Sequence, residues 1–196
     1  MSLKPARVGR YCVKHDAFCK AKHGPARYDR VVVDEALHQA VMEAAGLLDV
    51  REAVGGLYDD VQREIDARRP VCVVSGRCCR FEEFGHRLFV TTAELAAFVY
   101  GLKNEQQRGR GLATANWDGT GCPFQSNKLC GVHAIRPFGC RMFFCDAIST
   151  QWQNEAYEQF HARLKRLHED LGVPYFYVEW RQALRALELS GTPTSF

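Results

Sequence analysis

The chain has 196 residues, of which 46% are hydrophobic and 25% are charged, and this balance indicates a globular protein and excludes a largely disordered one. The net charge of +3 is small and the basic residues are scattered among acidic ones, so we expect no nucleic-acid partner. No apolar run reaches the roughly 18 residues of a membrane helix, and no apolar stretch follows the basic residues near the start as it does in a secretory signal. We therefore expect a cytoplasmic protein without membrane association.

Helical patterns dominate the first part of the chain. Residues 1–30 are polar and basic, and they predict an irregular or partly helical lead-in. Asp34 predicts the cap of a following helix, whose apolar positions are Leu37, Val41, Ala44 and Leu48. A second helix is expected to be interrupted at Gly55-Gly56 and stopped by Pro70. Its apolar face consists of Val54, Leu57, Val61 and Ile65.

The middle of the chain alternates between short elements and connections. Residues 71–74 form a short apolar segment, and residues 87–90 predict a short strand. Thr91 and Glu94 form a capping-box pattern at the start of a helix. The apolar face of that helix consists of Leu95, Phe98, Val99 and Leu102. Residues 103–121 are polar and glycine-rich, which predicts a long connection that is either mobile or a lid.

The second half of the chain begins with residues 122–146, whose density of cysteine, proline, glycine and aromatic residues predicts a loop-rich scaffold. A long amphipathic helix is predicted from Gln151 to Leu171, followed by a strand at residues 174–179. Trp180, Leu184 and Leu187 indicate a final helix, and residues 190–196 are expected to fray. The predicted fold is mainly α with small β elements, in a single domain over residues 1–196, organised around the cysteine region at 72–146.

Nine cysteines are the main departure from an ordinary composition. An odd number of cysteines in a protein without a sign of export argues against a disulfide framework. Thiolates are soft ligands that zinc and iron-sulfur clusters prefer, although a free cysteine also serves as a small buried hydrophobic residue. We expect at least four of the seven cysteines in the central region to bind metal. These are Cys72, Cys78, Cys79, Cys122, Cys130, Cys140 and Cys145.

Two segments carry most of these cysteines and resemble a known family. They read CVVSGRCC from Cys72 to Cys79 and CPFQSNKLCGVHAIRPFGCRMFFCD from Cys122 to Asp146. Together they resemble the YkgJ-type cysteine-cluster family of zinc- or iron-chelating proteins, whose pattern is C-x2-C-G-x-C-C, then a Cys-Pro pair, a further cysteine and R-P-x-x-C-R. The matching positions are Cys72, Gly76, Cys78, Cys79, Cys122, Pro123, Cys130, Arg136, Pro137, Cys140 and Arg141. The resemblance implies a metal-chelating role and covers somewhat over a third of the chain.

Ser75 stands where the family pattern has its second cysteine, so the C-x2-C knuckle that grips a tetrahedral zinc is missing. The remaining cysteines come from separated segments, which favours an iron-sulfur cluster clamped between loops, with zinc as the alternative. His133 or Asp146 is a candidate for completing the site. Cys78 and Cys79 are adjacent, and because successive side chains generally diverge, we expect them not to bind one metal side by side.

Arg136 and Arg141 flank Cys140, and they are candidates to donate hydrogen bonds to thiolate sulfur or to bind an anionic ligand. A pairing of Arg136 with a carboxylate is the equally weighted alternative. Pro137 is expected to stiffen the turn that presents Cys140.

Cys12, His15, Cys19 and His23 form a second pattern with four possible zinc ligands. On a continuous helix they share one face but span roughly 16 Å, so that only a broken helix brings them to one metal. The commoner explanation is a surface or partly buried helical face.

Three functions fit the sequence. The first is a metal or cluster binder that acts in maturation, storage or sensing, because no P-loop, dinucleotide-binding or nucleophile-elbow motif is present. The second is a protein-modifying enzyme such as a lysine N-methyltransferase, because flagellin lysine methylases resemble the family in their cysteine cluster. The third is a structural metal with a protein partner bound by the long helix from Gln151 to Leu171.

Overall fold

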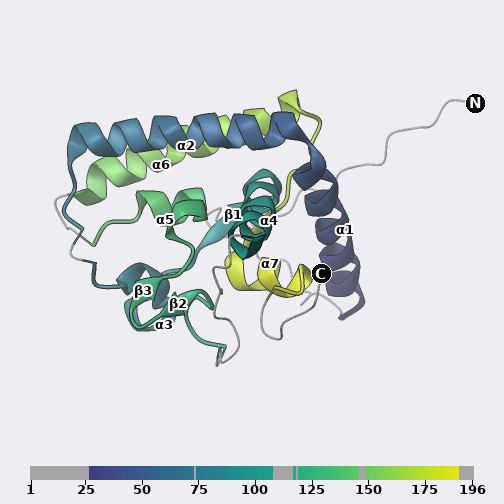
Figure 1. Cartoon of the computed structure of the whole chain (residues 1–196), viewed down its shortest axis with the longest axis horizontal. Helices are drawn as coiled ribbons and strands as arrows, with labels where there is room; N and C mark the ends of the chain where they lie inside the picture. The colour runs from purple at the N-terminus through teal and green to yellow at the C-terminus, as the bar shows by residue number, and fades with distance from the viewer. Residues whose placement is uncertain (1–26, 73, 108–116, 118, 146–148, 190–196) are drawn as a thin grey trace, which may run out of the picture.

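The computed structural model describes residues 27–72, 74–107, 117, 119–145 and 149–189 of the chain. Over this part the fold is mainly helical with two small antiparallel sheets, which confirms the predicted class (Figure 1). The pattern of Cys12, His15, Cys19 and His23 lies outside the described residues, as do the rest of the first 26 residues and residues 190–196. No helix of the described residues is long and apolar enough to cross a membrane.

The first two helices are α1 (Arg27–Gly46) and α2 (Leu48–Arg68). Asp34 lies inside α1 with helical residues before it, so the prediction that it caps this helix is wrong. The predicted positions Leu37, Val41 and Ala44 are buried, but Leu48 is 56% exposed. The reason is that the backbone becomes extended at Leu47, with ψ 124°, and a new helix starts at Leu48.

Helix α2 runs through Gly55 and Gly56 without a break, so the predicted interruption is also wrong. Each glycine costs a helix about 1 kcal/mol relative to alanine. The buried apolar face of α2 packs against α4, α5 and α6 and offsets that cost. The helix ends at Arg69, whose left-handed backbone lets its N–H bond the Ile65 carbonyl at 2.8 Å, and Pro70 follows.

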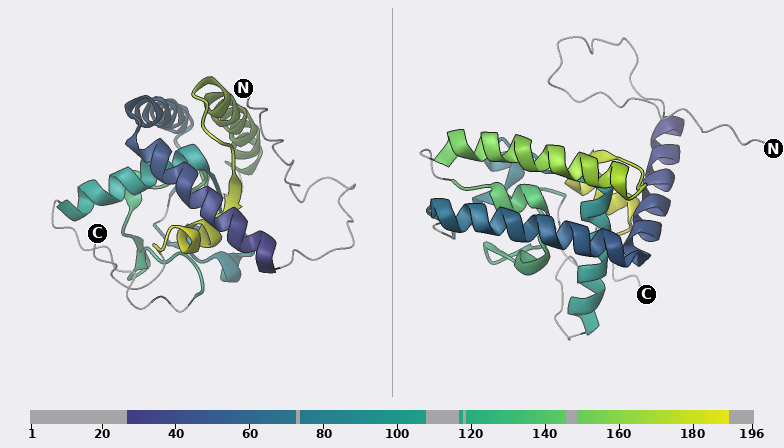
Figure 2. Two further views of the ribbon diagram at one scale, coloured as in Figure 1. Left: turned by 90° about the vertical axis from the view of Figure 1, so that its right-hand side faces the viewer. Right: turned by 90° about the horizontal axis from the view of Figure 1, so that it is seen from above.

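Helix α4 (Thr92–Gln107) crosses the interior and packs against both α1 and α2 (Figure 2). The predicted capping box is confirmed, because the Thr91 N–H donates to Glu94 Oε2 at 2.9 Å and the Glu94 N–H donates to Thr91 Oγ1 at 3.4 Å. The four apolar positions predicted for this helix are buried. The helix continues to Gln107, so the polar connection begins later than predicted, and residues 108–116 and 118 lie outside the described part.

Strand β1 (Phe89–Thr91) pairs antiparallel with β4 (Tyr177–Glu179), with Val90 opposite Val178. Both strands lie within or one residue beyond the predicted segments and are shorter than expected. Helix α6 (Thr150–Asp170) confirms the predicted long helix and lies beside α2 (Figure 2). It ends where Gly172 takes φ 64° and the Val173 N–H bonds the His168 carbonyl at 3.0 Å. The predicted final helix is α7 (Trp180–Ala186).

The cysteine-rich region is built from short elements, as predicted. The first segment supplies a 3-10 turn η1 (Arg77–Cys79) and α3 (Phe81–Phe84). The second supplies a hairpin of β2 (Gln125–Ser126) and β3 (Leu129–Cys130), a 3-10 turn η2 (His133–Ile135) and α5 (Phe138–Met142). Figure 1 shows β2, β3 and α3 gathered on one side of the molecule, away from α1. The described part of these segments packs on a core formed by α1, α4 and α7.

Candidate metal centre

Gly76 allows the first cysteine segment to dock on the second. Its φ of 67° lies in the left-handed region, and an added Cβ would be 2.4 Å from the Lys128 carbonyl oxygen. The Gly76 carbonyl in turn accepts the Gln125 side-chain amide at 2.9 Å. Because only glycine tolerates both the backbone conformation and this close approach, Gly76 fixes the position of the turn that carries Cys78 and Cys79.

The second segment is shaped to meet that turn. Asn127 and Lys128 both have positive φ, which is the two-residue turn that joins the short strands of the hairpin and presents Cys130. Gly121 has φ 57°, and a Cβ there would be 2.7 Å from the Cys79 carbonyl oxygen. The same carbonyl accepts the Cys122 N–H at 2.7 Å. The backbone therefore brings Cys122 and Cys130 to Cys79.

Four thiols meet at this junction, and we call Cys78, Cys79, Cys122 and Cys130 the thiol set. All four belong to one packed cluster of the core, and the Cys79 thiol lies close enough to the other three to shift their pKa values. Cys79 and Cys122 are buried, with 4% and 9% of their surface exposed, while Cys78 and Cys130 are half-buried. Cys78 and Cys79 both lie in the 3-10 turn, and the expectation that they do not bind one metal side by side stays a prediction.

The interactions within the thiol set shift the pKa values of its members in opposite directions. The contact with Cys79 lowers the pKa of Cys78 to about 6 against the opposing effect of burial, and the charge of Arg136 lowers it further. The same contact lowers the pKa of Cys130 to about 7 and also lowers the pKa of Cys122. The pKa of Cys79 itself is raised, first by its hydrogen bond to Cys122. These shifts favour the thiolate form at Cys78 first, and the thiolate is the form that binds metals.

Two buried hydrogen-bond donors beside the thiol set have no partner among the described residues. The Nε of Arg136 and the indole Nε1 of Trp180 are both buried and unsatisfied. Arg136 lowers the pKa of Cys78 and Cys130 by its charge, and Trp180 lowers the pKa of Cys122. Because an unsatisfied buried donor is costly, a negatively charged centre bound by these thiolates fits the donors that surround it.

Backbone N–H groups also face the sulfurs. The Phe124 N–H lowers the pKa of Cys122, and the Val132 N–H lowers the pKa of Cys130. Hydrogen bonds of this kind stabilise thiolates and tune the properties of a bound centre. Backbone N–H groups, an indole and a guanidinium therefore lie near the sulfurs, and the Trp180 and Arg136 donors have no partner among the described residues.

Cys140 lies next to the thiol set on α5. Burial is the main reason that its pKa is raised, and the nearby Cys122, Cys130 and Cys78 add to the effect. Helix α5 begins after Pro137, and its Phe138 N–H donates to Glu94 Oε1 at 2.9 Å. The capping-box glutamate of α4 thus also holds the start of the helix that presents Cys140.

Arg141 on α5 bonds the backbone that precedes this helix. Its Nε donates to the Arg136 carbonyl and its Nη2 donates to the Ala134 carbonyl, both at 2.9 Å. Its guanidinium also lies 4.2 Å from the centre of the Tyr58 ring. Arg141 thus contacts backbone carbonyls and an aromatic ring rather than sulfur. Among the described residues, Arg136 forms no ion pair with a carboxylate.

The other predicted site residues lie apart from the thiol set. Cys72 and Cys145 are exposed, and the described contact of Cys145 is with Ser75, whose Oγ lies 3.8 Å from its sulfur. His133 is exposed in η2, and Asp146 lies outside the described residues. The structure therefore brings five of the seven predicted cysteines together and leaves Cys72 and Cys145 at the surface.

Among the described residues, no group of three or more His, Cys, Asp and Glu side chains is arranged to hold a metal ion. The four cysteines of the thiol set pack together in one cluster of the core, and metal binding by them stays a prediction.

Several contributors to this site were not found from the sequence. Trp180 was recognised only as an apolar residue of the last helix, and no local pattern places its N–H beside Cys122. Glu94 was recognised as a capping residue, but its bond to Phe138 joins residues that are 44 positions apart. Gly121 carries a weak signal, because glycine is the residue that permits positive φ and close backbone approach, but the sequence does not say which backbone it meets.

Comparison of the chain with family models, with curated proteins and with solved structures finds no match. The resemblance to the YkgJ-type family therefore stays a prediction from its cysteine motifs.

Proposed function

We propose that this protein binds a metal centre through Cys78, Cys79, Cys122 and Cys130, with an iron-sulfur cluster as the first candidate and zinc as the alternative. The observation that carries the proposal is the packing of these four cysteines in one cluster, where Cys122 and Cys130 come from a distant segment of the chain and the Cys122 N–H bonds the Cys79 carbonyl at 2.7 Å. Four sulfur donors from separated loops are the ligand set that both kinds of centre use.

The residues around the thiol set support a negatively charged centre. Arg136 and Trp180 have buried donors without partners, and backbone N–H groups of Phe124 and Val132 face the sulfurs. Hydrogen bonds and positive charge near cluster sulfurs raise the reduction potential of iron-sulfur proteins. Because these donors and this positive charge suit a negatively charged cluster, we rank an iron-sulfur cluster above zinc as the bound centre.

Bound at this place, an iron-sulfur cluster supplies one-electron transfer, whereas zinc supplies a cross-link between loops. The four cysteines are the ligands, Cys140 is a reserve donor beside them, and Arg136 balances their charge. A cytoplasmic location is part of the proposal, because reducing conditions keep thiols free for metal. Sensing, storage or maturation of a cluster are the roles that such a centre fits.

Metal analysis of the full chain, purified without oxygen, tests the proposal. We expect iron and acid-labile sulfide in equal amounts, together with visible absorption from sulfur-to-iron charge transfer. One zinc per chain in a colourless protein supports the alternative centre. A folded protein that contains neither iron nor zinc, and that takes up neither when they are supplied, contradicts the proposal.

A further inference from the structure

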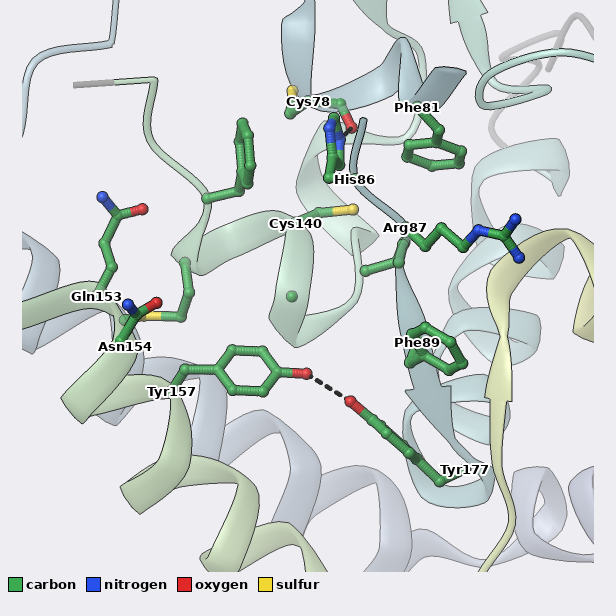
Figure 3. A pocket seen from close by; sticks show the side chains of 14 residues that line it. Cys78, Phe81, His86, Arg87, Phe89, Cys140, Gln153, Asn154, Tyr157 and Tyr177 are labelled. Atoms are coloured by element: carbon green, nitrogen blue, oxygen red, sulfur yellow. Dashed lines mark hydrogen bonds between the residues drawn. The ribbon is translucent and has the colours of Figure 1, made fainter. Parts of the chain in front are cut away.

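A cavity of about 210 Å³ opens beside the thiol set, between α5, α6 and β1 (Figure 3). Cys78 and Cys140 line it at one end, and Tyr157 and Tyr177 line it at the other. This volume is below the roughly 300 Å³ at which pockets for drug-sized molecules begin, so a ligand with a single ring suits it. The lining consists of protein side chains alone, so the cavity does not require a bound metal.

Two pairs of stacked rings line the cavity. The rings of His86 and Phe143 have centres 4.6 Å apart at 21°, and those of Phe89 and Tyr177 have centres 5.4 Å apart at 28°. Aromatic walls gain most from a planar ring, which stacks on them or meets them edge to face. The shape and lining of the cavity therefore favour a flat, aromatic ligand.

The hydrogen-bonding groups of the cavity are only partly satisfied. His86 Nε2 lies 3.3 Å from the Cys78 carbonyl oxygen, so Nε2 carries the proton and donates, while Nδ1 is buried as an acceptor without a partner. Tyr157 and Tyr177 share one hydrogen bond of 2.8 Å between their hydroxyl oxygens. Two hydroxyls have two protons, so one O–H donor remains for a ligand. The cavity thus offers one free acceptor and one free donor.

The charge of the lining argues against an ionic ligand. No carboxylate is among the lining residues, and Cys78 is the lining thiol whose pKa is lowered, so a cation would have to compete with the proposed metal for that thiolate. Arg87 is the charged residue of the lining, and Figure 3 shows its guanidinium directed away from the Tyr157–Tyr177 pair. An uncharged ligand with both a donor and an acceptor matches these groups.

We propose that this cavity binds a small, uncharged aromatic carboxamide, whose ring lies between the aromatic walls and whose amide carbonyl accepts the free hydroxyl proton of the Tyr157–Tyr177 pair. The proposal goes beyond the metal centre and does not depend on it. It assigns a ligand site that shares its wall with Cys78 and Cys140. A ligand bound there lies directly beside the thiols.

Benzamide is the probe, and its binding to the full chain is measured by calorimetry and by saturation-transfer NMR. Two comparison ligands of similar size isolate the assigned features: benzylamine adds a positive charge, and cyclohexanecarboxamide keeps the amide but loses the flat ring. We expect saturable binding of benzamide in the millimolar range or tighter, and binding of each comparison ligand that is weaker by about tenfold or more.

Three variants locate the site. The double variant Tyr157→Phe/Tyr177→Phe keeps both rings and removes both hydroxyls, so we expect affinity to fall about three- to tenfold. Asn154→Trp places a large side chain at an exposed lining position and should abolish binding, whereas Gln151→Trp on the same helix does not line the cavity and should leave binding unchanged. Metal content is measured for every protein, so a lost metal centre is distinguished from a lost ligand site. No saturable binding of benzamide, equal binding of cyclohexanecarboxamide, or unchanged binding to Asn154→Trp overturns the inference.

Discussion

The substitution Glu94→Gln tests how the interior joins α4 to the cysteine-bearing helix α5. The buried carboxylate accepts the Thr91 N–H at 2.9 Å and the Thr91 hydroxyl at 3.0 Å through one oxygen, and the Phe138 N–H at 2.9 Å through the other. Burial is the main reason that the pKa of Glu94 rises from an ordinary value of 4.5 to about 7. The carboxyl therefore favours its protonated form in the folded protein.

The sign of the pH effect follows from that shift. A group whose pKa is raised by folding contributes stability that is present in full below pH 4.5 and is lost as the pH rises through about 7. Integrated from about pH 5 to about pH 8, this single group removes about 2.5 kcal/mol from the free energy of unfolding. Glutamine does not titrate, so the variant lacks this loss.

Urea unfolding of both proteins at these two pH values measures the effect. Other titrating groups are common to both proteins, so the difference between their two pH dependences isolates Glu94. We expect the wild type to lose about 2.5 kcal/mol more than Glu94→Gln between the two conditions. An equal loss in both proteins would refute the argument that burial keeps this carboxyl largely protonated up to neutral pH.

Three other variants follow from the packing and charges of the described residues. Gly76→Ala introduces both a strained φ and a backbone clash, so thermal denaturation should show a loss of about 2 kcal/mol or more, whereas Gly85→Ala has a similar φ but open space and should lose about 1 kcal/mol. Arg136→Gln removes a charge that lowers the pKa of Cys78, so alkylation of that thiol in metal-free protein should slow at neutral pH. Leu164→Ala empties a fully buried position between α2 and α6, and calorimetry should show a loss of about 2 to 5 kcal/mol.

The helices were the most predictable part of this fold, because their apolar spacing is local information. Leu57 and Val61 are buried on α2 where the apolar spacing placed them, and the capping box of Thr91 and Glu94 starts α4 as predicted. The errors occurred where tertiary packing outweighs local preference. Gly55 and Gly56 stay helical because α2 packs against three neighbouring helices.

The cysteine motifs identified the right region but not the arrangement within it. Cysteine spacing cannot distinguish Cys79, which contacts three thiols, from Cys72, which is exposed. That difference arises from the left-handed backbone at Gly76 and from the approach of Gly121 to the Cys79 carbonyl. Both contacts join distant segments, so only the folded chain reveals which thiols converge.

Metal content of Cys79→Ser, compared with that of Cys72→Ser, tests the central proposal most directly. Both variants remove one thiol, but Cys79 lies within the thiol set and Cys72 is at the surface. Each protein is purified without oxygen and its fold is checked by circular dichroism. The proposed centre predicts that Cys72→Ser keeps the metal content of the wild type and that folded Cys79→Ser loses most of it. Equal metal content in the two folded variants would contradict the assignment.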